Sequence, residues 1–213
     1  IDYHALAAEI IIIVTILGAL SLDLILTRKN KYLIAIFSVI GTVASLIPLI
    51  TLWFSQDTNR VLFEGSYVVD RFSLILKGIF ILATYLTLIL SVKYIESEGY
   101  YQGEYYFLLL CSLLGAVIIA SSRDLLILFI GIELASGPMF LLSGWKKSSP
   151  ESNEGAIKFF LFGVLSAALI LYGFSLLYGL TGEILFENIA FLLESNNSSA
   201  ASMAIVLVLA GIG

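Results

Sequence analysis

The sequence is poor in charged residues and has almost no side chains that hold metals or redox groups. Only 13% of its 213 residues are charged, against about 25% in an ordinary soluble domain. Its single cysteine, Cys111, excludes an internal disulfide. With one histidine, His4, the sequence offers no ligand set for haem, zinc or an iron–sulfur cluster. A glycine-rich phosphate loop and a Ser/His pair are also missing. We therefore expect no cofactor in this chain and no redox or hydrolytic chemistry of its own.

The net charge of -5, without any block of basic residues, excludes the electrostatic surface that nucleic acids require. The sequence is instead rich in apolar residues, which make up 60% of the chain and give a mean hydropathy of +1.03. A single soluble core of this length cannot bury so much apolar surface. The composition therefore predicts an integral membrane protein.

Seven apolar stretches predict an all-α polytopic helical bundle that forms a single transmembrane domain. They cover residues 6–26, 32–54, 72–94, 105–120, 124–144, 153–180 and 200–213. Helices are expected rather than barrel strands, because the stretches do not alternate between apolar and polar residues. The last stretch would be about 21 Å long as a helix, against roughly 30 Å of hydrocarbon. We therefore expect this span to continue beyond Gly213.

The loops between these stretches are short, and their basic residues predict an orientation. The longest loop, 55–71, contains the alternating stretch VLFEGSYVVD, which predicts a small hairpin. Loops after the first, third and fifth stretches carry six basic residues, against three after the second and fourth. The six are Arg28, Lys29, Lys31, Lys93, Lys146 and Lys147, and the three are Arg60, Arg71 and Arg123. Because loops rich in Lys and Arg stay inside, the N-terminus is expected outside.

Charged residues in and around the apolar stretches fall into two groups. Those at the ends of stretches are expected to lie at the water interface, and they are Glu9, Asp23, Glu104, Arg123 and Asp124. Those well inside stretches are Lys77, Glu133 and Lys158. A charge at the centre of a membrane helix costs about 2.5–3.5 kcal/mol on insertion scales. Such residues usually face the interior of a bundle and mark an ion or proton route.

Glu133 is the strongest candidate for such a route, because it lies near the middle of the stretch 124–144. Pro138 follows five residues later and removes the helical hydrogen bond to the Leu134 carbonyl. Gly137 beside it favours a kink, which would leave a free backbone oxygen near the carboxyl group. The alternative is a neutral, hydrogen-bonded glutamic acid that serves only the structure.

The two lysines have competing interpretations. Lys158 stands about one and a half turns into the next stretch, on the adjoining antiparallel helix, so it could approach Glu133. It could equally extend along its helix to the inner surface. Lys77, near the outer end of the third stretch, is a further candidate, and for it the extended, surface-seeking conformation is favoured.

The sequence resembles subunit N of the proton-pumping NADH-quinone oxidoreductases, an antiporter-like membrane subunit of respiratory complex I. The resemblance covers nearly the whole chain and is sharpest over 94–182. Its most specific motifs are "EYY" at 104–106, "ELASGP" from Glu133, "NEGAIKFFLFG" from Asn153 and "LLYGLTG" before Glu183. Together these motifs are specific, although none of them is specific alone.

The resemblance implies a family fold of about fourteen helices arranged as two inverted repeats. It implies that Glu133 and Lys158 match a glutamate and a lysine of the family's proton path, and that a partner lysine lies beyond Gly213. The chain would be a proton-translocating subunit of an enzyme in the bacterial inner membrane. NADH, FMN, iron–sulfur clusters and quinone would be bound by partner subunits, which carry out the redox chemistry.

Several alternatives remain open from the sequence. A Mrp-type cation/proton antiporter subunit and a membrane-bound hydrogenase subunit would share the buried Glu and Lys. A seven-helix receptor is compatible with an outer N-terminus, although the mid-membrane Glu133 argues against it. A passive membrane scaffold would use its ionisable residues only to hold helices together.

Overall fold

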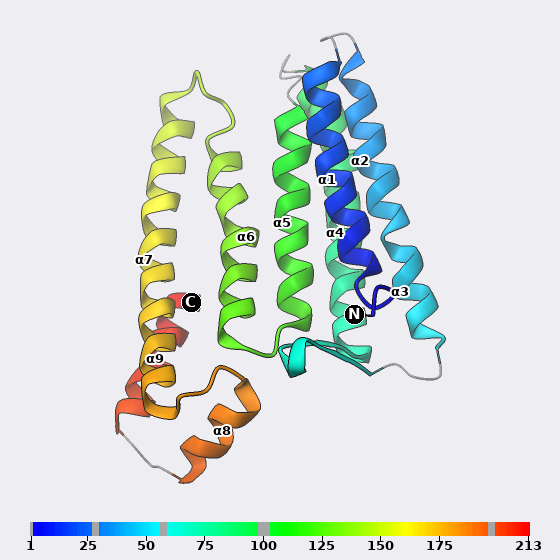
Figure 1. Ribbon diagram of the computed structural model, residues 1–213. Helices are drawn as coiled ribbons and strands as arrows, with labels where there is room; N and C mark the ends of the chain where they lie inside the picture. The colour runs from blue at the N-terminus through cyan, green and yellow to red at the C-terminus, as the bar shows by residue number, and fades with distance from the viewer. Residues whose placement is uncertain (1, 27–29, 56–58, 98–102, 196–198) are drawn as a thin grey trace.

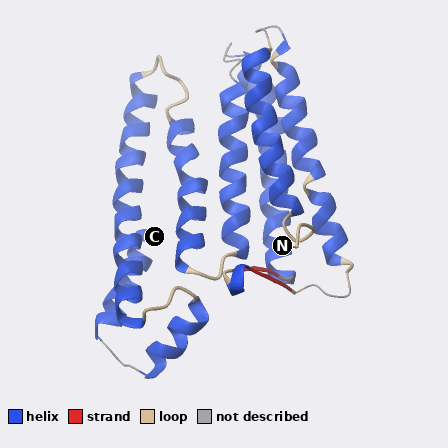
Figure 2. Ribbon diagram, in the orientation of Figure 1, coloured by secondary structure: helices blue, strands red, loops and turns tan. Residues whose placement is uncertain are grey.

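The computed structural model describes residues 2–26, 30–55, 59–97, 103–195 and 199–213. Within these ranges the chain is built almost entirely from helices, together with a small two-stranded hairpin (Figure 1, Figure 2). The predicted all-α membrane fold is therefore confirmed.

Six helical spans in the described part of the chain are long and apolar enough to cross a membrane. They are α1 (Ala7–Ile25), the pair α2 (Tyr32–Ala44) and α3 (Leu46–Trp53), α4 (Arg71–Ser97), α5 (Gly103–Ser121), α6 (Leu125–Ser143) and α7 (Pro150–Thr181). The stretch 200–213 forms a shorter apolar helix, α9 (Ser199–Ile212). A further helix, α8 (Phe186–Ser195), lies in a segment that the sequence analysis left without structure.

The predicted span 32–54 is divided at Ser45 into α2 and α3. Pro48 explains the break, because it has no N–H to donate to the carbonyl of Ala44 four residues earlier. Ser45 stabilises the junction, since its hydroxyl donates a 2.7 Å hydrogen bond to the carbonyl of Thr42.

The helices pack in two connected groups (Figure 1). Helices α1, α2, α4 and α5 share a buried apolar core that includes Ile12, Ile34, Ile81 and Leu110. Helix α6 packs between α5 and α7, and α9 packs on α7. This order places α6, the helix that carries Glu133, between the main bundle and the C-terminal helices.

The predicted hairpin is present, and it lies across the end of the bundle where α1 and α4 begin (Figure 2). Strands β1 (Arg60–Leu62) and β2 (Tyr67–Val69) pair antiparallel, joined by a turn (Phe63–Gly65) in which all three residues have positive φ. Alternate residues of β2 face the core, so Tyr67 and Val69 are buried. The hairpin thereby directs a tyrosine hydroxyl into the bundle.

Asp124 is an N-cap that fixes the start of α6, and its replacement by alanine is expected to destabilise the protein by about 1 kcal/mol. Its buried carboxylate accepts a 2.6 Å hydrogen bond from the Ile127 N–H, which no helical carbonyl satisfies. Unfolding of the full-length protein by SDS titration checks this value. Asp124→Asn should retain most of the stability, because asparagine caps as well as aspartate. Equal losses for both variants would contradict a capping role.

Candidate functional site

Glu133 lies in the middle of α6 with a half-buried side chain. Its carboxyl group has no hydrogen bond and no ion pair with any residue that the structure describes. At helical spacing it shares a face with Leu126, Ile130 and Leu141, whose exposed fractions are 55%, 58% and 63%. The face of α6 that carries Glu133 is therefore not covered by the described part of this chain.

The opposite face of α6 is fixed tightly against α5. Gly115 of α5 lies so close to α6 that an added Cβ would be 2.3 Å from the backbone nitrogen of Ala135. The hydroxyl of Ser112 donates a 2.7 Å hydrogen bond to the carbonyl of Ala135. This contact sets the rotation of α6 about its axis, and it turns Glu133 away from α5.

Helix α6 is continuous from Leu125 to Ser143 and includes Pro138. The hydroxyl of Ser136 donates a 2.8 Å hydrogen bond to the carbonyl of Ile132, one turn earlier on the same helix. The kink predicted at Gly137 and Pro138 stays a prediction, because the helix is not interrupted there.

Lys158 lies on α7 and has a side chain that is 66% exposed. Its ammonium group forms an ion pair with Glu154, one turn earlier on the same helix. Glu133 and Lys158 are thus on neighbouring helices, but the described structure does not bring their side chains into contact.

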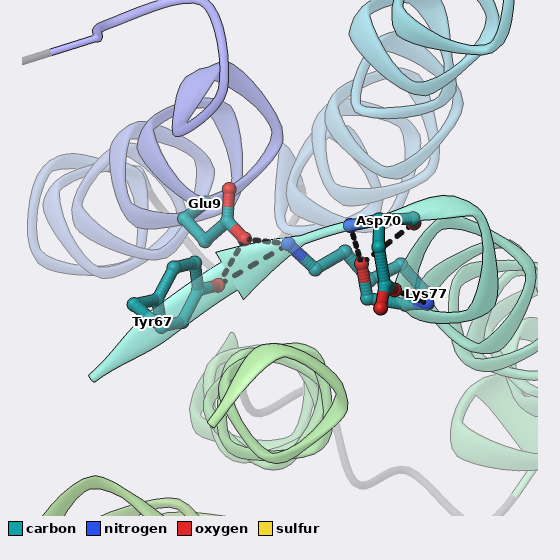
Figure 3. Close-up of polar contacts among 5 residues, drawn as sticks. Glu9, Tyr67, Asp70 and Lys77 are labelled. Atoms are coloured by element: carbon teal, nitrogen blue, oxygen red, sulfur yellow. Dashed lines mark hydrogen bonds and ion pairs between the residues drawn. The ribbon is translucent and has the colours of Figure 1, made fainter. Parts of the chain in front are cut away.

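Lys77, in contrast, is almost completely buried, with 1% of its side chain exposed. The favoured prediction that it extends to the surface is wrong. Its Nζ lies 2.6 Å from Oε1 of Glu9 and 3.2 Å from the hydroxyl of Tyr67 (Figure 3). The expectation that Glu9 lies at the water interface is also wrong, since its side chain is 8% exposed.

This cluster is not evident from the sequence, because its three members come from distant segments. Glu9 is on α1, Tyr67 on β2 and Lys77 on α4. One signal was available: opposite charges stand near the starts of two spans that are separated by a single span and therefore run parallel, and an alternating stretch lies just before the second of them. The hairpin covers this end of the bundle and thereby removes Glu9 from water.

A cleft of about 590 Å³ opens where α5, α6 and α7 meet. Its polar lining includes Glu104, Lys147 and Asn153, and its apolar lining reaches Phe140. Phe140 is about two helical turns from Glu133 along α6. The lining of the cleft therefore ends about two turns short of Glu133.

The described residues contain no group of three or more His, Cys, Asp or Glu side chains that could hold a metal ion.

Comparison with known proteins agrees with this arrangement. The family model described as "NADH:quinone oxidoreductase/Mrp antiporter, TM" matches residues 122–213, which include α6 and α7. A protein from a Nostoc species, named NAD(P)H-quinone oxidoreductase subunit 2, is 36% identical over 225 aligned positions that cover 100% of this chain. The chain belongs to the antiporter-like membrane subunits of this family.

Solved structures show the same fold. A chain of respiratory complex I from Thermus thermophilus matches 97% of this antiporter-like chain with a TM-score of 0.76 and 27% identity. A chain of an archaeal membrane-bound sulfane sulfur reductase matches 98% of it with a TM-score of 0.85, but at 20% identity this likeness concerns the fold alone. The chain spans 43% of the Nostoc relative and 43% of the Thermus chain.

Proposed function

We propose that this chain is part of a proton-translocating membrane subunit of an NADH-quinone oxidoreductase, corresponding to subunit N, and that Glu133 carries the proton. The observation that supports the proposal most directly is a carboxyl group in the middle of a membrane helix, held at a fixed rotation by the α5–α6 contact. An ionised carboxyl group at this depth is costly unless it finds a partner, so residues of this kind are usually retained for transport of ions or protons. The family relationship makes proton transport the function that explains it best.

The uncovered face of α6 supports a route that is completed by other parts of the assembly. Glu133 lies on this face with the exposed Leu126 and Ile130. A further segment or subunit packed there would shelter the carboxyl group from lipid and would place a basic group within reach. Movement of that positive charge toward or away from Glu133 would then drive release or uptake of the proton.

Lys158 enters the proposal as a second proton-path residue, supported by its place on the helix next to α6. Its ion pair with Glu154 holds it in the described structure. Relay to Glu133 therefore requires Lys158 to leave Glu154, which an exposed pair within one helix permits at a cost of only a few tenths of a kcal/mol.

Glu133→Gln is expected to lower the initial rate of proton translocation by about tenfold or more, because the amide keeps the shape but cannot release a proton. The measurement is NADH-driven acidification of inverted membrane vesicles that contain the full-length subunit in its complex. Glu187→Gln provides the matched control, since Glu187 is exposed on α8. Unchanged pumping by Glu133→Gln in a fully assembled complex would overturn the assignment.

We infer partner subunits that bind NADH, FMN, iron–sulfur clusters and quinone, because the relatives of this chain are named as subunits of NAD(P)H-quinone oxidoreductase. The family description also names Mrp antiporters, which makes a cation/proton antiporter subunit the second candidate. Mass spectrometry of subunits that co-purify with the full-length protein separates the two. Flavin and iron–sulfur subunits support the oxidoreductase, and a purely membrane-embedded set supports the antiporter.

We also propose that the protein lies in a bacterial inner membrane with its N-terminus outside. The support is the excess of basic residues in the loops after the first, third and fifth spans. Arg28 and Lys29, which contribute to it, lie outside the described residues. Labelling of a cysteine introduced beside His4 with a membrane-impermeant reagent in whole cells tests the orientation.

A further inference from the structure

The cluster of Glu9, Tyr67 and Lys77 has the features of a protonatable site and not only those of a helix contact (Figure 3). The side chains of Lys77 and Glu9 are 1% and 8% exposed and form a 2.6 Å ion pair. The Nζ of Lys77 also lies 5.0 Å from the centre of the Tyr67 ring. A charge pair removed this completely from water is sensitive to the number of hydrogen bonds that support it.

The hydrogen bonding of Glu9 is incomplete. Its Oε1 accepts from both Lys77 and Tyr67, whereas its Oε2 is buried and has no partner. The hydroxyl of Ser121 at the end of α5 is likewise buried, and it adjoins Tyr67. Buried carboxylate oxygens are rarely left unsatisfied, and an internal water is the usual means of satisfying them.

The surroundings of the pair leave few other groups that could set its charge. Helices α2 and α3 contain no charged residue. Asp70, just before α4, acts on Lys77 electrostatically, but it also forms a 2.9 Å ion pair with Arg123. Burial is the main cause that raises the pKa of Tyr67 well above its ordinary value, and the negative charge of Glu9 is the second. The phenol therefore stays a neutral hydrogen-bond donor.

We propose that Glu9, Tyr67 and Lys77 form a second proton-exchange site, separate from Glu133, in which one water molecule binds to Oε2 of Glu9. A proton moves from Nζ of Lys77 to Oε1 of Glu9, so that one N–H bond breaks and one O–H bond forms. The charged pair thereby becomes a neutral amine and a neutral acid. Rotation of the neutral carboxyl group then turns its O–H toward the water. The water takes this proton and passes one of its own protons on to bulk water, which leaves Glu9 ionised beside a neutral lysine, and the reverse sequence restores the acid.

Further polar groups lie near this site, at the end of the bundle where α1 and α4 begin. Asp70 and Arg123 lie at the same end of the bundle, and their side chains are 24% and 42% exposed. At the start of α4, the Ser73 hydroxyl accepts a hydrogen bond from the Asp70 N–H and donates one to the Asp70 carbonyl. Protons at Glu9 therefore need to cross only the first turns of α1 and α4 to reach water.

The role of this site in transport rests on the proposed function, but its protonation does not, and the test addresses protonation directly. The full-length subunit in its native complex is titrated with acid and base while infrared difference spectra are recorded in H₂O and D₂O. We expect a band of a protonated carboxylic acid that appears with falling pH and is absent in Glu9→Gln. A Glu133→Gln complex should keep this band whether or not it still pumps protons.

Two further variants make the assignment specific. Tyr67→Phe removes a hydrogen bond to the carboxylate, and it should raise the pH midpoint of the band by about one to two units. Lys77→Met removes the counter-charge, so the band should be present throughout the accessible pH range. Absence of any Glu9-dependent band from about pH 5 to about pH 10 would overturn the proposal and leave a permanent structural ion pair.

A high-resolution structure of the assembled complex tests the water separately. Density within hydrogen-bonding distance of Glu9 Oε2 is the expected result. A dry contact between Oε2 and apolar atoms would overturn the bound water and, with it, the proposed exit for the proton.

Discussion

Replacement of Lys77 by methionine is expected to destabilise the folded protein by about 3–5 kcal/mol at pH 7. Methionine fills most of the volume of lysine, so the loss comes from the carboxylate of Glu9, which stays buried without its counter-charge. The carboxylate can escape this state by taking up a proton. For an ordinary glutamate pKa of about 4.3, protonation at pH 7 costs about 3.7 kcal/mol, which lies within the expected range.

The same reasoning fixes the pH dependence. Neutral Glu9 is favoured in folded Lys77→Met, so the unfolded state of this variant binds fewer protons than the folded state above about pH 4.3. Its stability deficit should therefore shrink as the pH falls toward that value and grow as the pH rises. SDS titration of the full-length subunit at several pH values measures this change.

Two controls separate the loss of a buried charge partner from a loss of packing. Glu9→Gln combined with Lys77→Met removes both charges, and the amide oxygen can still accept from Tyr67. This double variant should recover most of the stability. Lys93→Met makes the same change at an exposed position of α4 and should alter stability by less than about 0.5 kcal/mol. A double variant as unstable as Lys77→Met would show that charge is not the cause.

The apolar stretches predicted the helical architecture well because each membrane helix must satisfy its own backbone within lipid. That constraint acts locally, so it is visible in the sequence. Pro48 alone accounts for the break at Ser45. The break was not predicted, because the apolar run 32–54 continues without interruption. Helix α8 was missed because it is short and amphipathic, and its apolar face finds a core only after folding.

The candidate site could be predicted only in part, because burial near the end of a span depends on what covers that end. Glu9 and an interfacial glutamate look alike in sequence, since both stand a few residues from water. The hairpin that covers Glu9 comes from a loop almost sixty residues away. The surroundings of Glu133, conversely, depend on whatever packs against a face that the described chain leaves exposed, so its role stays a proposal.

Replacement of Gly115 by alanine at the contact between α5 and α6 is expected to lower the free energy of unfolding by about 3 kcal/mol. This value lies at the upper end of the costs of overpacking. An added Cβ would meet the Ala135 nitrogen at 2.3 Å and the Gly131 carbonyl oxygen at 2.7 Å. These are backbone atoms and cannot turn aside as a side chain can. The two helices must therefore separate, and the hydrogen bond from Ser112 to Ala135 must lengthen.

Gly78→Ala is the matched control for this change, because Gly78 lies within α4 and nothing would contact its added Cβ within 4 Å. It should leave the protein as stable or more stable by up to about 1 kcal/mol, as expected for Gly→Ala in a helix. SDS titration of both variants compares them directly. Because the α5–α6 contact also sets the rotation of α6, Gly115→Ala should lower proton translocation more than it lowers assembly of the complex. Equal stability of the two glycine variants would mean that α5 and α6 are not in this close contact, and the orientation inferred for Glu133 would then lose its support.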